Sequence, residues 1–434
     1  MPVLSAPRPT PGTGQVITDS AATAQAGPRS QQGRAGELSW SGRAARQLVL
    51  RQLDQLPHAW IAWHEAGETT LLGQGHRVAG ELIVEDPRFF AHVLMHGSVG
   101  FGEAFVDRWW TTPDLLNLLR TLAGSTPSSS RGSWWGRAIG WAPKQLLRWA
   151  RQNTRAGSRR NISAHYDLSN EFFAAFLDPT MTYSSGLFES DGATLHDASL
   201  AKYERICRRL DLQSDDHVVE IGCGWGGFAE YAAANYGCRV TGVTISREQL
   251  AYAQQRIERA GLSERVDLRF CDYRDLTGKY DKLVSIEMIE AVGRRFLPQF
   301  FAKCSELLQP HGQMMLQAIT IPDQRFDAYC RNVDFIQKHV FPGGCLPSLG
   351  AIQTAVGERT DLRLLETVDF AEDYARTLVA WRERFHGAAE RIAELGFDER
   401  FMRLWDYYLC YCAAGFYERQ IGLAHQHFAK PAAR

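Results

Sequence analysis

The stretch that decides the fold reads Val218-Val219-Glu220-Ile221-Gly222-Cys223-Gly224-Trp225-Gly226-Gly227-Phe228. Its apolar start is typical of a buried strand, and Phe228–Ala234 is typical of a helix. Gly222, Gly224 and Gly227 satisfy the G-x-G-x-x-G spacing, in which a tight turn brings the backbone amides of a helix start against a nucleotide-like ligand. Two cofactor classes fit such a turn, a dinucleotide and S-adenosylmethionine.

Strand and helix patterns alternate after this turn. The expected strands are Arg239–Thr244, Val266–Phe270, Lys282–Ile286 and Gln313–Gln317. The expected helices are Ser199–Leu210 before the turn, Arg247–Ala260 after it, and one that continues from 287 to about Leu307. This alternation predicts an α/β fold with a parallel, doubly wound, Rossmann-like sheet and a ligand at the carboxyl ends of its strands.

Composition limits the classes of function. The chain has 434 residues, is 45% hydrophobic and 22% charged, and carries a net charge of −1, so no global charge favours nucleic acid. Nine cysteines without a C-x-x-C pair favour a reducing compartment and give no zinc-site pattern, so we expect no metal. No apolar run reaches the roughly 18 residues of a membrane span. We therefore expect a cytoplasmic protein that meets a membrane only at its surface.

The N-terminal third divides into two parts. Residues 1–40 are rich in Pro, Gly, Ser and Gln, which predicts a disordered tail. Residues 44–125 predict a small α+β domain. Its expected elements are strands at Leu71–Gly75 and Glu81–Glu85, a helix at Pro87–Leu94, and a glycine-punctuated turn at Gly97–Phe105 that is packed by Trp109 and Trp110.

Residues 126–160 combine cations with tryptophans, and no Asp or Glu occurs between Leu115 and Tyr166. The residues concerned are Arg131, Arg137, Lys144, Arg148, Arg151, Arg155, Arg159 and Arg160, with Trp134, Trp135, Trp141 and Trp149. Such a stretch suits an anionic lipid surface, at about 1 kcal/mol per near-surface cation. A solvated linker is the alternative, and single-stranded nucleic acid is a third, less favoured one.

Residues 161–428 form the expected catalytic domain. Its first part, Asn161–Phe173 and Asp178–Gly186, precedes the glycine turn, and we expect it to fold over the cofactor pocket. Its last part, Asp373–His427, is expected to be helical and is rich in aromatic residues, most of them in the core.

Two acidic positions distinguish the cofactor classes. A dinucleotide site needs an acid about twenty residues after the first glycine, but Gly242–Ser246 contains no carboxylate. Arg247 keeps an NADP-dependent oxidoreductase open as an alternative. Glu220 can instead pair with an amino-acid ammonium, and Asp272 with Tyr273 can bind an adenine. This arrangement favours S-adenosylmethionine and a class I methyltransferase.

The residues from about Asn161 to Ala424 resemble the cyclopropane fatty acid synthase family, S-adenosylmethionine-dependent enzymes that act on unsaturated acyl chains of lipids. The resembling motifs are His165–Asp167, Met181–Ser184, Val219–Gly226, Val243–Ser246 with Gln249, Glu287–Glu290, Phe341–Ser348, Asp373–Tyr374 and Thr377–Leu378. Gly100–Ala104 and Trp109–Trp110 also resemble the smaller, lipid-engaging domain of two-domain members.

The resemblance implies roles for individual residues. Gly222 and Gly224 would approach the methionyl part of the cofactor, and Thr244 with Gln249 would bind the ribose. Asp272 and Tyr273 would lie at the adenine, and Tyr183 and Ser184 would close the pocket. A bound bicarbonate would be the base, held at the positions Glu290, Tyr374, Ile319 (through its backbone), Ser185 and Gln317.

Two of those positions depart from the family. Ser185 stands where the family commonly has Cys, and Gln317 stands where it commonly has His, which removes a titratable imidazole from beside the base. We therefore expect methyl transfer to the double bond of an unsaturated phospholipid acyl chain, with cyclopropane as the first expected product and a methyl- or methylene-branched chain as the alternative. A non-catalytic lipid-binding protein is a further alternative, and the resemblance suggests a homodimer.

Overall fold

A computed structural model describes residues 40–125 and 168–433. The predicted tail before residue 40, the predicted basic stretch at 126–160 and the motif His165–Asp167 lie outside the described residues.

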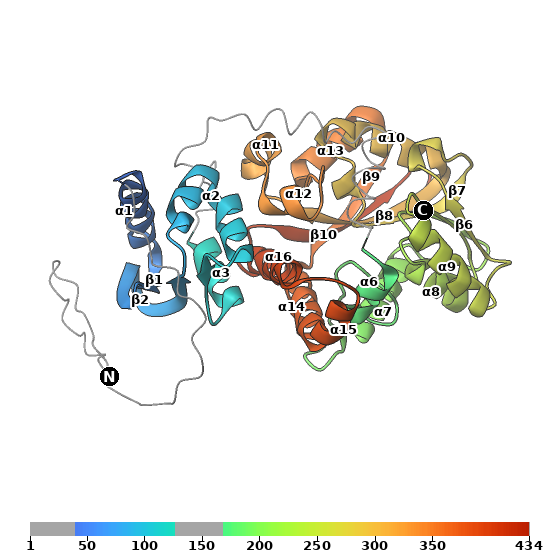
Figure 1. The fold of residues 1–434 in the computed structure, drawn as a ribbon. Helices are drawn as coiled ribbons and strands as arrows, with labels where there is room; N and C mark the ends of the chain where they lie inside the picture. Colours follow the sequence, from blue (N-terminus) through green and yellow to red (C-terminus); the bar gives the residue numbers. More distant parts are fainter. Residues whose placement is uncertain (1–39, 126–167, 434) are drawn as a thin grey trace, which may run out of the picture.

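The larger part of the described chain is built on a seven-stranded sheet with strand order β6-β5-β4-β7-β8-β10-β9 (Figure 1). β4 to β8 pair in parallel, and β10 is antiparallel to both neighbours. The strands are β4 His217–Ile221, β5 Arg239–Thr244, β6 Val266–Phe270, β7 Tyr280–Ile286, β8 Leu308–Thr320, β9 Arg363–Asp369 and β10 Gly422–Ala429. The chain steps from β4 out to β6 and returns beside β4 as β7, which confirms the predicted doubly wound α/β fold.

Helices cover both faces of this sheet. α8 Gly227–Tyr236 and α9 Arg247–Arg259 lie on one face with α7 Leu195–Arg209, and α10 Leu297–Leu307 and α13 Leu349–Arg359 lie on the other (Figure 1). Val219 and Ile221 pack toward α10 and α13, whereas Val218 packs toward α7. Because side chains alternate along a strand, Glu220 points to the α7 face.

The remaining helices lie at the carboxyl ends of the strands and beyond. They are α6 Asn170–Phe176, α11 Asp323–Arg331, α12 Phe335–His339, α14 Ala371–Gly387, α15 Ala389–Glu394 and α16 Glu399–Tyr417. α6, α14 and α16 share one aromatic core, which includes Phe172, Phe176, Trp381, Phe385 and Trp405. The predicted aromatic-rich helical region is therefore present, although β10 makes its last residues a strand.

Three expectations about local structure were wrong. A single strand, β2 Glu68–Val84, replaces the two expected between Leu71 and Glu85. The expected turn at Gly97–Phe105 belongs to helix α2 Arg88–Val106, which is broken only at Gly97, where φ is +61°. The expected helix from 287 begins only at Leu297, because Gly293 (φ +79°) separates two short 3₁₀ turns, Ile289–Ala291 and Arg294–Phe296.

The N-terminal module contains α1 Trp40–Asp54, β1 Pro57–Glu65, β2, α2, β3 Trp110–Thr111 and α3 Leu115–Gly124. It lies at one end of the molecule, against α16 (Figure 1). At Gly102, a Cβ would lie 2.5 Å from the Phe335 ring and 2.7 Å from the Tyr407 ring. Glycine therefore lets α2 approach α12 and α16 closely. Arg403 adds two hydrogen bonds to the Phe105 carbonyl, 2.8 and 2.6 Å long.

Among the residues that the structure describes, no helix has both the length and the apolar composition needed to cross a membrane.

Candidate functional site

The predicted site residues meet around one cavity of about 970 Å³. The cavity lies where β4 to β8 end, as expected for a doubly wound sheet. The predicted residues that line it are Tyr183, Ser184, Glu220, Gly222, Gly224, Thr244, Gln249, Asp272, Tyr273, Glu290, Ile319 and Tyr374. Ser185 and Gln317 are fully buried directly behind this lining.

The glycine turn after β4 has the open backbone that a close ligand requires. Gly222 and Gly224 have φ values of +90° and +51°, and a Cβ at Gly224 would meet no atom within 4 Å. Glu220 is only 3% exposed, and its Oε2 has no hydrogen-bond partner among the described residues. Burial raises the pKa of Glu220 to about 8, against the opposing effect of Lys202. An unpartnered buried acid beside an open turn fits a cationic ligand group such as an ammonium.

Thr244 and Gln249 lie together at the end of β5. The Thr244 hydroxyl donates to Oε1 of Gln249 over 3.1 Å and accepts from the Ser246 amide, also at 3.1 Å. Ser246 caps the N-terminus of α9 by accepting from the Gln249 amide. Local capping thus brings both predicted ribose-binding side chains to the cavity.

Asp272 lies at the predicted adenine position, but its carboxylate is already engaged. Both of its oxygens accept from the Arg274 side chain, at 2.8 and 2.6 Å, and Oδ1 also accepts from the Arg274 amide. Tyr273 packs edge-on against Phe300 of α10. This ion pair orients Asp272 at the cavity wall.

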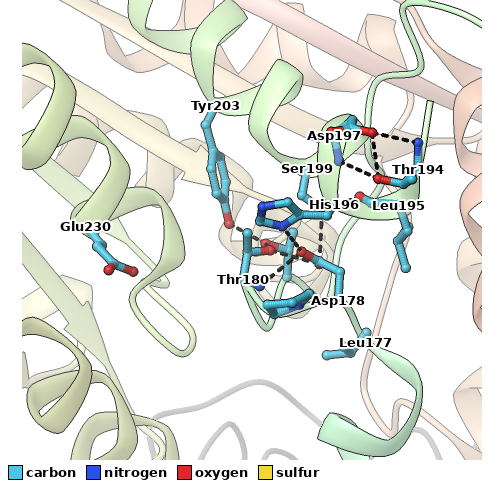
Figure 2. Close-up of polar contacts among 12 residues, drawn as sticks. Leu177, Asp178, Thr180, Thr194, Leu195, His196, Asp197, Ser199, Tyr203 and Glu230 are labelled. Atoms are coloured by element: carbon cyan, nitrogen blue, oxygen red, sulfur yellow. Dashed lines mark hydrogen bonds and ion pairs between the residues drawn. The ribbon is translucent and has the colours of Figure 1, made fainter. Parts of the chain in front are cut away.

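The segment Asp178–Ser184 folds over the cavity and is held on α7 by a buried network (Figure 2). Asp178 accepts from the amide and hydroxyl of Thr180, from Ser199, and from His196 at 3.1 Å. Thr182 extends the network to the Tyr203 hydroxyl. These bonds position Tyr183, whose hydroxyl lies 2.9 Å from that of Tyr408. Of the segments expected to fold over the pocket, Met181–Ser184 line the cavity, and Asn161–Asp167 lie outside the described residues.

Lys202 is a buried cation that the sequence reasoning missed. Its side chain is fully buried, and its ammonium donates to the Ser184 hydroxyl over 2.6 Å. Burial lowers its pKa to about 8, while Glu287, Asp178 and Glu220 oppose that change. The available signal was its position on the apolar stripe of α7, among Ala198, Ser199, Tyr203 and Ile206, where a lysine needs an acidic partner.

Glu287 is the second missed residue, although it belongs to the quoted motif Glu287–Glu290. Its Oε1 accepts from the backbone amide of Ser185 at 2.9 Å and from the side-chain amide of Gln317 at 2.6 Å. Its Oε2 accepts from the Tyr374 hydroxyl at 2.6 Å. Its side chain lines the cavity at the end of β7.

Glu290 lies beside Glu287 and has a different environment. Its Oε1 accepts from the Ile319 amide at 2.6 Å, and its Oε2 has no partner among the described residues. Burial, and then the charge of Glu287, raise the pKa of Glu290 to about 8. With a pKa of about 8, Glu290 largely carries a proton at neutral pH.

These contacts do not fit the bicarbonate that the resemblance implied. Ser185, Gln317, Tyr374 and Ile319 were its expected holders, and all four already donate to Glu287 or Glu290. A further anion about 4 Å from Glu287 would be repelled by about 4 kcal/mol at an effective dielectric constant of about 20. The expected anion site is filled by the protein's own carboxylate.

Position 317 carries no imidazole, but the ring of another histidine lies behind Gln317. His425 of β10 contacts Gln317, with its Nε2 2.7 Å from Oε1 of Gln317. Burial lowers the pKa of His425 to about 3, so the ring is neutral and its N–H donates to that oxygen. This bond turns the amide nitrogen of Gln317 toward Glu287.

Comparisons with known proteins show the family to which the chain belongs. Residues 153–426 match the mycolic acid cyclopropane synthetase family. The tuberculostearic acid methyltransferase UfaA1 of Mycobacterium tuberculosis is 41% identical over 385 residues, 87% of this chain and 88% of that protein. The cyclopropane-fatty-acyl-phospholipid synthase of Escherichia coli is 36% identical over 368 residues, 83% of this chain and 92% of that protein.

Solved structures show the same relationship. The cyclopropane synthase MmaA2 from Mycobacterium tuberculosis superimposes with a TM-score of 0.59 at 30% identity, over 63% of this chain and 98% of that one. The mycolic acid cyclopropane synthase CmaA1, solved with SAH and CTAB, has the same TM-score and coverage at 29% identity. The chain therefore belongs to the mycolic acid cyclopropane synthetase family and is an S-adenosylmethionine-dependent lipid methyltransferase.

Proposed function

We propose that this protein transfers the methyl carbon of S-adenosylmethionine to the double bond of an unsaturated phospholipid acyl chain. The observation that carries the proposal is a continuous cavity, which joins the glycine turn and Thr244 to an apolar region between the N-terminal module and α16. A cofactor and an acyl chain would therefore share one enclosed space.

The apolar region is lined from two sides. α2 and α3 contribute Val99, Phe101, Leu119 and Leu122, and α16 contributes Tyr411, Ala414 and Gly415. Apolar walls with a few polar groups at one end suit a long acyl chain whose reacting carbons reach the polar end. This supports a part for the N-terminal module in substrate binding.

The surface near this region supports contact with a membrane. Met95 of α2 is 58% exposed and immediately precedes His96–Val99, which line the cavity. An exposed apolar side chain next to an apolar passage suits a lipid surface. The predicted lipid-binding stretch at 126–160, outside the described residues, would add cations to the same function.

The residues around the polar end suit the chemistry of an alkene. S-adenosylmethionine, when bound, supplies an electrophilic methyl group. The chain's part is to exclude water and hold the double bond in line, which can supply roughly 7–11 kcal/mol. A cation then develops on the acyl chain. Tyr374, stacked on Phe416 at 4.5 Å, and Tyr183, stacked on Trp381 at 5.2 Å, offer aromatic faces worth about 1–2 kcal/mol each when desolvated.

Loss of a proton completes the reaction in one of three ways. Loss from the added methyl closes a cyclopropane, our first proposed product. A hydride shift before that loss gives a methylene branch, and loss from a neighbouring chain carbon gives a methyl-branched alkene. The branched outcome is the second candidate, because the relative at 41% identity is named a methyltransferase and because Ser185 and Gln317 depart from the cyclopropane pattern.

The test is product analysis. The protein is incubated with S-adenosylmethionine labelled with carbon-13 in its methyl group and with vesicles of a monounsaturated phospholipid. The two product types have equal mass, so carbon-13 NMR of the released fatty acids separates a cyclopropane carbon from a branch carbon. Absence of any labelled fatty acid would contradict the proposal.

A further inference from the structure

Glu287 occupies the position of an anion at the polar end of the cavity. Its carboxylate accepts from three groups in separate parts of the chain: the backbone amide of Ser185, the side-chain amide of Gln317 and the hydroxyl of Tyr374. Gln317 and Tyr374 are themselves oriented, the first by His425 and the second by its stacking on Phe416. Such convergence of oriented donors is typical of a built site for one charged group.

The backbone supports a functional role for this position. Glu287 has φ +48°, a left-handed conformation that a glutamate rarely adopts. The Glu287 amide donates to the Gln317 carbonyl over 2.9 Å, so β8 holds the strained residue at the end of β7. Strain of this kind, maintained by the surrounding ladder, is concentrated at functional sites.

Glu287 also lies beside the turn that faces the cofactor. Its neighbour Met288 touches Gly222, where a Cβ would lie 2.9 Å from Cγ of Met288. Gly222 and Glu287 line the same cavity. Glu287 therefore belongs to the side of the cavity that carries the glycine turn.

Glu287 and Glu290 differ in the groups that oppose the effect of burial. Three donors and the buried Lys202 favour the carboxylate of Glu287, although burial raises its pKa above the ordinary value. A buried carboxylate with a raised pKa is a stronger base than a free one. Two neighbouring acids with different environments commonly divide the acid and base roles in this way.

We propose that Glu287 is the catalytic base that accepts the proton from the methylated acyl chain, so that no bound bicarbonate is needed. This inference rests on the proposed function. In ring closure, a C–H bond of the added methyl breaks, and its electron pair forms the closing C–C bond to the cationic carbon. In branching, the electron pair of the broken C–H bond forms a carbon–carbon double bond instead. The proton binds to an oxygen of Glu287 and passes to water when the product leaves.

The experiment compares the wild type with Glu287→Ala, Glu287→Asp and Glu287→Gln, with and without bicarbonate, in buffer freed of carbon dioxide. We expect the wild-type rate to change less than twofold on adding bicarbonate. Glu287→Gln should lose at least about 100-fold in turnover, and Glu287→Asp should retain part of the activity. Glu287→Ala should be inactive alone and regain turnover with bicarbonate or formate, because the three donors can then hold the small anion.

Two binding measurements, of S-adenosylmethionine and of bicarbonate, accompany the rate measurements. Calorimetry should show S-adenosylmethionine affinity within about threefold of wild type in each variant, which separates loss of the base from loss of the fold. Carbon-13 bicarbonate should bind to Glu287→Ala and not to the wild type. A wild-type rate that depends on bicarbonate, or a Glu287→Gln rate near wild type, would overturn the inference. If the wild type acts on no unsaturated phospholipid, the proposed function is wrong, and the base role is wrong with it. The bicarbonate-binding comparison would still show whether Glu287 fills the anion site.

Discussion

The Tyr374 hydroxyl donates a 2.6 Å hydrogen bond to Oε2 of Glu287 and so joins α14 to the carboxyl end of β7. This bond lowers the pKa of Glu287, against the larger effect of burial. Tyr374→Phe keeps the ring stacked on Phe416 and removes only the donor. We expect turnover to fall roughly 10- to 100-fold, the range for a bond to a charged group.

The pH dependence of Tyr374→Phe follows from the same bond. The base must be ionised, so the rate falls on the acid side of the profile. Without the donor the pKa of Glu287 rises, and the acid limb should move to higher pH. The check is the pH–rate profile beside that of Tyr280→Phe, a control on β7 whose hydroxyl bonds to the Thr277 carbonyl. An unmoved acid limb in Tyr374→Phe would contradict this reading.

Glu220→Gln should weaken S-adenosylmethionine binding. The substitution keeps the size of the side chain and removes the negative charge that Glu220 can take up when a cofactor ammonium lies opposite it. We expect the dissociation constant to rise roughly 10- to 100-fold, measured by calorimetry. Glu248→Gln, an exposed change in the first turn of α9, is the matched control and should bind as the wild type does. Equal affinities in both variants would rule out this role for Glu220.

The stability of the cofactor-free protein should pass through a minimum near pH 8. The pKa of Glu220 is about 8 when folded and 4.5 ordinarily, so between these values the folded state binds more protons and stability falls as pH rises. The pKa of Lys202 is about 8 when folded and 10.5 ordinarily, so above pH 8 the unfolded state binds more protons and stability rises.

Urea unfolding from about pH 5 to about pH 10 measures this curve. Each limb should span roughly 2–4 kcal/mol. Glu290 has the same raised pKa and contributes to the falling limb as well, so Glu220→Gln should make that limb shallower without removing it. Lys202→Met should flatten the rising limb. Limbs of unchanged slope in both variants would show that other groups control the pH dependence.

Ser98→Trp should obstruct the acyl-chain passage. Ser98 is half-buried in α2, just after the break at Gly97, and lines the cavity. A bulky ring there should lower kcat/KM for phospholipid vesicles roughly tenfold while S-adenosylmethionine binding stays unchanged. Ser98→Ala is the size control. Wild-type rates in Ser98→Trp would place the acyl chain elsewhere.

The sequence alone determined the parallel strands β4 to β8 and the cofactor turn, because these depend on local patterns, whereas β9 and β10 were not predicted. Period-two and apolar runs predicted β4 to β8, and the glycines with Glu220 predicted the turn. The same patterns failed where tertiary contacts decide conformation. Glu287–Phe296 looks like the start of a helix, yet the strained Glu287 and Gly293 hold it in short 3₁₀ turns.

The identity of the anion at the site was decided only by the tertiary structure. The sequence places Ser185, Glu287, Gln317 and Tyr374 up to 189 residues apart and does not state which carboxylate their donors meet. The resemblance pointed to Glu290 and a bound bicarbonate. Folding brings the donors to Glu287 instead, sets neutral His425 behind Gln317, and buries Lys202 nearby. Hydrogen bonds between distant elements therefore decided which carboxylate meets the three donors.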